Sequence, residues 1–264
     1  MKQREGAMSF FELRDALAEP GCALCRLRNR SADGFLDTLL WESVNDPARR
    51  REIRRARGFC YEHGWALARA TASVGVAIIT RDVLQSLLEA VEDAGFQANP
   101  LLSLRRVQET VNPKTPSTAT AALVTDLEPK ASCPACVWTD KMEAIYLDTL
   151  LHNLTDKDSL RADYEASEGL CLPHFRQALA RVRKEAVYDA LVGAQRSAWE
   201  RLIAQLSESI RKSDYRHLDE AWGDEAGAWL RGIAALVGAR PDDKDRHSKG
   251  AVWSFRRPEQ NSTG

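Results

Sequence analysis

Apolar residues recur at intervals of three and four along most of the chain, which is the spacing of one face of an α-helix. Two such stripes consist of Leu24, Leu27, Phe35, Leu36, Leu39, Leu40 and Val44, and of Trp138, Met142, Ile145, Tyr146, Leu150, Leu151 and Leu154. Longer apolar or amphipathic stretches cover residues 74–91 and 186–211. Helical spacing therefore dominates, and the pattern predicts an all-α protein.

Capping residues and helix breakers suggest where the first and last helices begin and end. The run Ser9-Phe-Phe-Glu12 fits a capping box and predicts the start of a short helix, which Pro20-Gly21 ends. Near the other end, Asp224 is expected to cap a helix that runs through Val237 and stops at Gly238.

The six cysteines and two of the five histidines form two sets with identical spacing. The first set is Cys22-Ala-Leu-Cys25, 34 intervening residues, and Cys60-Tyr-Glu-His63; the second is Cys133-Pro-Ala-Cys136, 34 residues, and Cys171-Leu-Pro-His174. Every position in the second set is its counterpart plus 111, since 133 − 22, 136 − 25, 171 − 60 and 174 − 63 give the same value. The segment at 36–40 also recurs at 147–151, so the chain contains a duplicated module that is too long for a solenoid repeat.

Metal binding accounts for these sets better than the alternatives. Disulfides do not persist in a reducing compartment, and a redox-active CxxC leaves the two CxxH motifs unexplained. Burial of cysteines as small apolar residues explains one set but not two with the same spacing. Three thiolates and one imidazole complete a tetrahedral zinc shell with no position left for water. We therefore predict two structural zinc sites, with an iron–sulfur cluster as the alternative.

Each copy is expected to be a helical hairpin with CxxC at its start and CxxH at its return. Turn residues at 45–47 and 156–158 precede a short helix, which closes at Gly58 or Gly169. A helix over 26–44 is about 28 Å long, whereas one over 48–57 returns only about 15 Å. We expect each site to form within its own copy; the alternative pairs the CxxC of one copy with the CxxH of the other.

The repeat and the composition of the remaining segments predict five regions. A first CxxC/CxxH helical module covers 9–95, a Pro/Thr-rich connector 96–130, a second module 131–212, a C-terminal helix 213–240 and a disordered tail 241–264, in which Trp253 and Phe255 lie. The fold class is therefore all-α, with two homologous helical metal-binding modules and additional C-terminal helices.

Charge is nearly balanced, because 37 Lys and Arg face 38 Asp and Glu, and this argues against a dedicated nucleic-acid-binding protein. Arginines nevertheless gather between Arg49 and Arg57. They form a phosphate-contacting patch, a solvated face, or a face that pairs with the acidic segment 158–168 of the second copy. The other three histidines, His152, His217 and His247, follow no ligand pattern. With no apolar run long enough for a membrane span and no secretory signal, the expected compartment is the cytoplasm.

The duplicated CxxC…Gly-x-Cys-x-x-His pattern resembles an uncharacterised bacterial family of unknown function. The resemblance also includes Leu-Asp-Thr-Leu-Leu segments and an ending like Ile210-Arg-Lys-Ser-Asp-Tyr215 before an acidic helix that contains tryptophan. It covers the chain from about Phe10 to Arg240 and implies no activity, substrate or partner.

The sequence contains no glycine-rich phosphate loop, no HExxH and no Ser/His/Asp arrangement, so we lean against an enzyme. We expect a non-enzymatic, metal-stabilised interaction or regulatory protein with a protein partner or self-association. The alternatives are an iron–sulfur or thiol redox sensor and nucleic-acid binding through the Arg49–Arg57 face.

Overall fold

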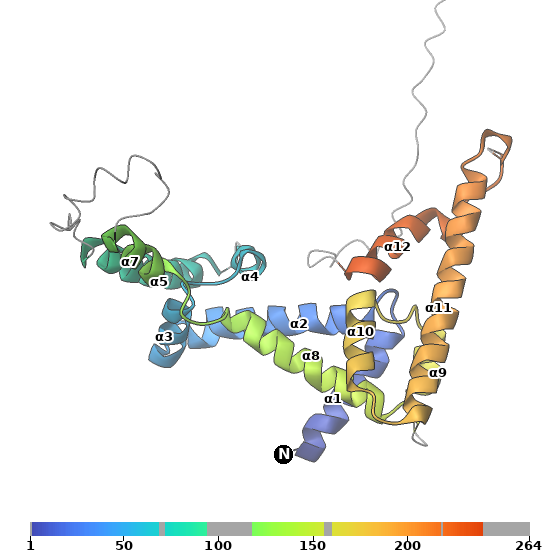
Figure 1. The fold of residues 1–264 in the computed structure, drawn as a ribbon, viewed down its shortest axis with the longest axis horizontal. Coiled ribbons are helices and arrows are strands. Elements are labelled where there is room, and N and C mark those ends of the chain that lie inside the picture. Colours follow the sequence, from blue (N-terminus) through green and yellow to red (C-terminus); the bar gives the residue numbers. More distant parts are fainter. Residues whose placement is uncertain (1, 69–71, 94–117, 156–159, 218, 240–264) are drawn as a thin grey trace, which may run out of the picture. The chain divides into compact units, whose positions relative to one another are not determined.

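The computed structural model describes residues 2–68, 72–93, 118–155, 160–217 and 219–239 (Figure 1). In these ranges every regular element is a helix, which confirms the predicted fold class. Contacts divide the chain into two compact units: unit 1 consists of Met1–Leu27 and Glu143–Gly264, and unit 2 of Arg28–Met142. The chain passes from unit 1 to unit 2 within α2 (Ala23–Thr38) and returns within α8 (Pro134–His152). Each unit therefore combines segments from both copies of the repeat.

Unit 1 is organised around the long helix α11. Besides parts of α2 and α8, unit 1 contains α1 (Lys2–Leu17), α9 (Arg161–Ala166), α10 (Leu172–Arg181), α11 (Glu185–Lys212), the 3-10 turns η4 (Tyr215–His217) and η5 (Asp224–Gly227), and α12 (Ala228–Val237). Helix α11 packs against α9 and α12, and α12 also packs against α10. The largest fully buried side chains of unit 1 include Leu13, Leu24, Leu147, Leu154, Tyr164, Leu170, Leu191 and Gln195. The predicted stretch 186–211 thus forms one continuous helix that buries an apolar side.

Unit 2 contains a second core beneath shorter helices. Its elements are a π-helical turn η1 (Leu39–Ser43) that continues α2, then α3 (Pro47–Arg55), α4 (Tyr61–Ala66), α5 (Ser73–Asp93) and α7 (Thr118–Leu127). Helix α5 packs against α3, α7 and η1. The buried core consists of Leu36, Leu39, Leu40, Ile53, Leu67, Ala72, Ile79, Val83 and Ala135. Leu36, Leu39 and Leu40 of the apolar stripe predicted after the first CxxC therefore lie in this core, and Phe35 and Val44 pack against it.

Glycines end the two short helices as the sequence predicts. Helix α3 begins at Pro47 after Asp46, whose side chain accepts a hydrogen bond from the backbone N–H of Ala48 at 2.8 Å. After α3 the chain turns at Gly58 with φ +99°, and after α9 it turns at Gly169 with φ +76°. Both glycines adopt the left-handed conformation that disfavours other residues, and each directs the chain into a CxxH motif.

Two predicted caps are wrong. Helix α1 begins at Lys2, so Ser9 lies inside it; its hydroxyl is 3.0 Å from that of Thr149, and Glu12 accepts a hydrogen bond from the hydroxyl of Tyr146 at 2.7 Å. Tertiary contacts with α8 use the two side chains that resemble a capping box. Asp224 starts the turn η5 instead of capping α12, which does end at Val237 before Gly238.

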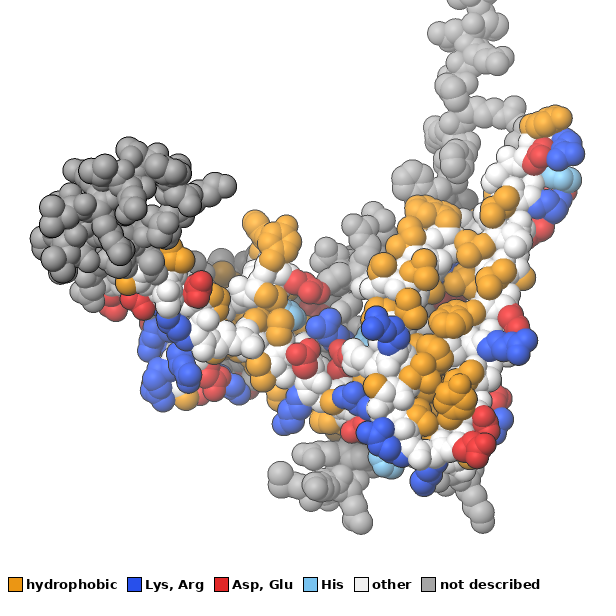
Figure 2. Space-filling view, viewed as in Figure 1, with side chains coloured by type: hydrophobic (Ala, Val, Ile, Leu, Met, Phe, Trp, Pro, Cys, Tyr) orange, Lys and Arg blue, Asp and Glu red, His pale blue; other side chains and the backbone are white. Residues whose placement is uncertain are grey.

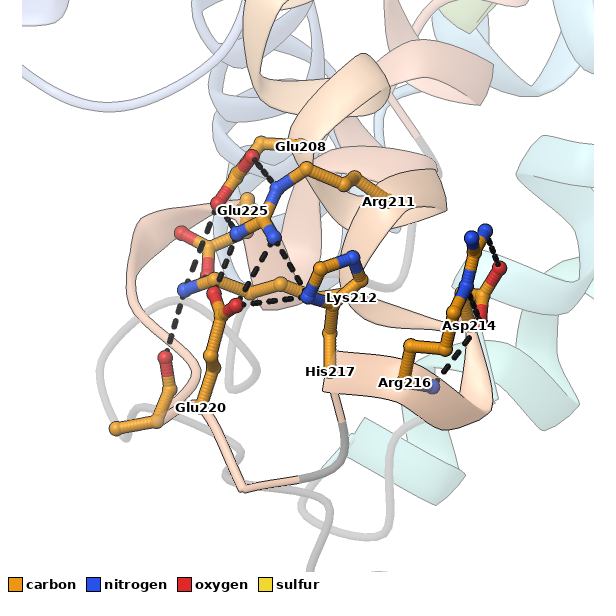
Figure 3. A network of polar contacts seen from close by, with 9 residues as sticks. Glu208, Arg211, Lys212, Asp214, Arg216, His217, Glu220 and Glu225 are labelled. Carbon is orange, nitrogen blue, oxygen red and sulfur yellow. Dashed lines mark hydrogen bonds and ion pairs between the residues drawn. The ribbon is translucent and has the colours of Figure 1, made fainter.

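An ion-pair network holds the connection between α11 and α12 (Figure 3). Lys212 donates to Glu225 Oε1 at 2.7 Å and to the carbonyl of Ala221 at 2.7 Å. Arg211 donates to Glu208 and to Glu220. These contacts fix the return of the chain, so that α12 packs back against α11 and its end reaches Cys25.

Several predictions fall wholly or partly outside the described residues. The tail 241–264 with Trp253 and Phe255, and most of the connector 96–130, belong to that category. Within the connector, residues 118–127 form α7, which packs against α5. No helix in the described ranges is both long and apolar enough to cross a membrane.

Candidate metal centres

Each candidate ligand lies at the start of a helix. The first cysteine of every pair directly precedes a helix, and its partner follows in the first turn. The carbonyl oxygens of Cys22, Cys60, Cys133 and Cys171 accept hydrogen bonds from the N–H groups of Arg26, Gly64, Val137 and Phe175 at 3.2, 2.8, 3.0 and 2.8 Å. The positive end of a helix dipole favours a thiolate over a thiol, so all four helix starts favour the charge state that binds metal.

The eight side chains form two clusters, and each cluster lies within one unit. Site A consists of Cys22, Cys25, Cys171 and His174 in unit 1, and site B of Cys60, His63, Cys133 and Cys136 in unit 2. Within each cluster the candidate ligand atoms lie within 4.8 Å of one another, and the group could hold a metal ion. Our expectation that each site forms within its own copy is wrong, because both sites pair the CxxC of one copy with the CxxH of the other.

Helix length explains this exchange. Helix α2 and the turn η1 extend from Ala23 to Ser43 and together are about 30 Å long at 1.5 Å per residue. The returning helix α3 has 9 residues and is about 14 Å long. Helix α3 therefore covers only about half the length of α2 and η1, which disfavours the return of Cys60 to Cys22, and Cys60 lies instead with the CxxC of the second copy.

Distances within the clusters match the edges of a tetrahedron around one ion. Bonds of about 2.3 Å to sulfur and 2.0 Å to nitrogen give edges of about 3.8 Å between sulfurs and 3.5 Å between sulfur and nitrogen. The Sγ–Sγ distance is 3.6 Å for Cys25–Cys171 and for Cys60–Cys136. The Sγ–Nδ1 distances to His174 are 3.5, 3.4 and 3.0 Å from Cys22, Cys25 and Cys171, and those to His63 are 3.2, 3.8 and 3.3 Å from Cys60, Cys133 and Cys136. All six cysteines are free thiols, and the donor set fits a tetrahedral ion.

Site A is enclosed by groups that orient its ligands. Nε2 of His174 lies 3.4 Å from Oε1 of Glu143, and both side chains are buried. This contact leaves Nδ1 free to point at the thiols, as in many sites where a carboxylate orients a metal-binding histidine. The N–H of Ala239 donates to Sγ of Cys25 at 3.4 Å. Gly238 has φ +95°, and a Cβ there would lie 3.4 Å from the same sulfur, so the end of α12 covers the site closely.

Gln195 of α11 braces the loop that leads into Cys171. Its side chain donates to the carbonyl of Leu170 at 3.0 Å and accepts hydrogen bonds from the N–H of Leu170 and the hydroxyl of Tyr164, both at 2.8 Å. A Cβ on Gly169 would lie 2.9 Å from Nε2 of Gln195, which is too close. The loop and Gln195 are therefore packed tightly enough to require glycine.

Site B has a more open environment. Its three cysteines are half-buried, whereas those of site A are buried. His63 is itself buried, yet no described residue forms a hydrogen bond or an ion pair with its Nε2. The repeat places Ala32 at the position of Glu143, since 143 − 111 = 32, and Leu84 at the position of Gln195, since 195 − 111 = 84. The two groups that enclose and brace site A therefore have no counterpart at site B.

Protonation in the metal-free clusters follows from burial and mutual hydrogen bonding. Burial raises the pKa of Cys22, but hydrogen bonds with Cys171, Cys25 and His174 outweigh it and bring the pKa well below its usual value. Hydrogen bonds with Cys171 and Cys22 raise the pKa of Cys25. Burial lowers the pKa of His174, but the thiolates and Glu143 raise it to about 12. Because site A then contains both thiol and imidazolium groups, a metal ion must displace protons to bind there.

In site B, burial governs both resolved groups. It raises the pKa of Cys136 to about 12, with help from the hydrogen bond to Cys60. Burial also lowers the pKa of His63 and keeps its imidazole neutral, which is the form that binds metal.

The remaining predicted features lie elsewhere. His152 contacts the carbonyl of its own helix at Asp148, His217 belongs to the network at the end of α11, and His247 lies outside the described residues. Arg50 and Arg54 pair with Asp82 of α5 at 3.3 and 2.7 Å. The arginine-rich face is therefore partly neutralised within unit 2.

Comparisons with known proteins identify relatives but no activity. The sequence profile of a family of unknown function, DUF6062, matches residues 6–243. An uncharacterised 23.9 kDa protein in the xynA 3′ region of Caldicellulosiruptor sp. (strain Rt8B.4) is 24% identical over 224 residues, which cover 84% of this chain and 97% of that protein. No solved structure matches.

Proposed function

The chain belongs to the family of unknown function DUF6062, and we propose that it is a non-enzymatic helical protein stabilised by two zinc ions, one in site A and one in site B. In this proposal the metal ions hold the fold together, and the helical surface binds a protein partner. All six cysteines are free, as is typical of proteins in a reducing compartment, and we propose that the protein is cytoplasmic.

The observation that carries the proposal is the tetrahedral spacing of three sulfurs and one nitrogen in each cluster. Four protein ligands fill the coordination shell of zinc, and a filled shell is typical of structural sites. Iron–sulfur clusters usually take four cysteines and spread their ligands over several iron atoms. Ligand atoms that all lie within 4.8 Å of one another, with a histidine among them, favour a single ion.

Zinc would link parts of the chain that are far apart in sequence. Site A joins Cys25 to Cys171, which are 146 residues apart, and site B joins Cys60 to Cys136, which are 76 residues apart. A structural zinc site contributes on the order of 10 kcal/mol to folding, which is as much as the whole stability of a typical domain. Removal of the metal is therefore expected to unfold both units.

A protein partner is supported by the apolar residues that unit 1 leaves exposed. Helix α12 exposes Trp229, Leu230, Ile233, Leu236 and Val237, which are 43–71% accessible. Apolar side chains also gather over unit 1 in the space-filling view (Figure 2). Exposed apolar patches of this kind are typical of surfaces that bind other proteins.

Metal analysis of anaerobically purified protein tests the proposal. We expect two zinc ions per chain by elemental analysis and a colourless sample. Replacement by Co²⁺ should give the intense visible absorption of tetrahedral cobalt with thiolate ligands. Iron with inorganic sulfide and a brown sample would refute the zinc assignment, and a metal-free folded protein would refute both. The same protein with all six cysteines replaced by serine is the control for metal bound elsewhere.

A further inference from the structure

We infer that site B is a peroxide-sensitive site, at which oxidation joins Cys60 and Cys136 in a disulfide and releases the zinc ion, while site A retains its own. The inference rests on the proposed function, since it needs a zinc ion in each site. It assigns to one of two equivalent ligand sets a chemical role that the other set does not share.

The cysteines of site A and site B differ first in how far they are exposed to solvent. The cysteines of site A expose 9%, 7% and 1% of their surface, and all three of site B are more open. Site B also lies beside Tyr61 and Trp65 of α4, which are 85% and 68% exposed, so solvent reaches the helix that carries His63. A small oxidant can therefore approach the sulfurs of site B while those of site A are covered.

The hydrogen bonds that the sulfurs accept also differ between the two sites, and this difference too makes site B the more reactive one. At site A the N–H of Ala239 donates to the sulfur of Cys25, and such a bond withdraws electron density from a thiolate. In the part of the chain that the structure describes, no backbone N–H donates to a sulfur of site B. The thiolates of site B are therefore the stronger nucleophiles towards a peroxide.

The supporting structure of site B is also weaker. His63 lies on α4, a helix of 6 residues that Cys60 directly precedes, whereas His174 lies on α10, a helix of 10 residues that Cys171 precedes. Glu143 holds His174, and Ala32 is the matching residue of the first copy. Local opening of a short helix with few supporting contacts costs less free energy, and it is the motion that separates ligands from the ion.

The reaction balances with hydrogen peroxide as the named oxidant. One zinc-bound thiolate attacks an oxygen of the peroxide, the O–O bond breaks, and a sulfenic acid forms with release of hydroxide. The second thiolate attacks that sulfur, the S–O bond breaks, and a disulfide forms as a second hydroxide leaves. Two protons from solvent convert the hydroxides to water. The two sulfurs lose two electrons and the peroxide gains them, while the third thiolate, Cys133, takes up a proton as zinc leaves.

We assign the disulfide to Cys60 and Cys136 because their sulfurs are in direct contact. Their sulfurs are 3.6 Å apart, and a disulfide bond requires about 2.0 Å. Cys60 precedes the short helix α4, so a small movement of that helix closes the remaining distance. The test therefore includes identification of this disulfide by mass spectrometry of peptides.

The experiment measures zinc release from the full-length protein with a chromogenic chelator after addition of hydrogen peroxide. The zinc content is measured first; fewer than two ions per chain overturns the proposed function, and the inference with it. With two ions present, we expect one to leave in a fast phase and the other at least about tenfold more slowly. Equal release of both ions, or a disulfide between cysteines of site A, overturns the inference alone.

A reciprocal pair of variants gives the matched control. Glu143→Ala gives site A the residue found in the first copy, and we expect its zinc to leave about tenfold faster. Ala32→Glu supplies site B with the carboxylate of the second copy, and we expect the fast phase to slow. Neither variant removes a ligand, so both should retain two zinc ions. If the release rates of both variants equal those of the original chain, the part of the inference that rests on support of the histidine is overturned.

Discussion

Gly169 offers the sharpest test of how the fold positions site A, because Gly58 in the first copy is its matched control. Both glycines have positive φ, so alanine at either position adds left-handed strain of about 1–2 kcal/mol. At Gly58 a new Cβ meets nothing within 4 Å, and strain is the whole expected cost. At Gly169 the new Cβ would lie 2.9 Å from Nε2 of Gln195 and 3.0 Å from Cβ of Ala198.

Displacement of Gln195 sets the larger cost at Gly169. The side chain makes three hydrogen bonds, two with the backbone of Leu170 and one with Tyr164, and all of them are buried. A buried polar group that loses its partner costs about 1–3 kcal/mol. Adding one such loss to the strain, we expect Gly169→Ala to cost about 2–5 kcal/mol and Gly58→Ala about 1–2 kcal/mol.

Hydrogen exchange of the zinc-loaded protein measures this difference locally, at the amide of Leu170 for one variant and at residues that follow Gly58 for the other. A local readout is needed because two units do not unfold as one two-state transition. Urea titration that records zinc release provides an independent measure. Equal destabilisation by the two alanine variants would refute the assigned role of Gln195.

Three further predictions concern the sites and the network at the end of α11. Cys133→Ser should lower the zinc content from two ions to about one and unfold unit 2, while site A stays intact although Cys171 belongs to the same copy as Cys133. Elemental analysis combined with hydrogen exchange checks this expectation. Loss of zinc from site A would contradict the exchanged pairing of the ligand sets. The backbone N–H of Gly223 and then Lys212 lower the pKa of Glu225 to about 2, so its contribution is complete above its unfolded pKa of about 4.3 and is lost as the pH falls towards 2. Amide exchange in α12 should accordingly differ between the original chain and Glu225→Gln at pH 6, and the difference should begin to shrink as the pH falls below about 4.3. Arg211→Ala removes solvent-exposed ion pairs, and thermal unfolding should show almost no change in stability.

The sequence predicts the helices well because their information is local. The apolar spacing, the glycines after the short helices and the ligand pairs at the helix starts all act within a few residues, and the structure confirms them. Pairing of the ligand sets is not local, because both pairings use the same motifs with the same spacing. Only the lengths of the two hairpin arms distinguish them, and that mismatch is visible in the sequence.

Residues that support the sites are harder to predict because they differ between the copies. Glu143 and Gln195 matter at site A, yet the repeat replaces them with Ala32 and Leu84, so the comparison of the two copies gives no indication of their role. Ser9 illustrates the opposite error. Its local pattern fits a helix cap, but a contact with Thr149, which is 140 residues away, determines its place.

The exchanged ligand sets have a consequence for synthesis on the ribosome. By the time His63 has been made, the nascent chain already contains a complete Cys3His set from one copy, and Cys133 follows 133 − 63 = 70 residues later. A zinc ion captured at that stage would hold the four ligands of the first copy in the wrong pairing and would leave the second copy to pair with itself. Because α2 and η1 together are about 30 Å long, we expect that, once this helix has formed, it disfavours pairing of Cys60 with Cys22 in the growing chain. The length of the first hairpin arm would then matter during translation as well as in the finished fold.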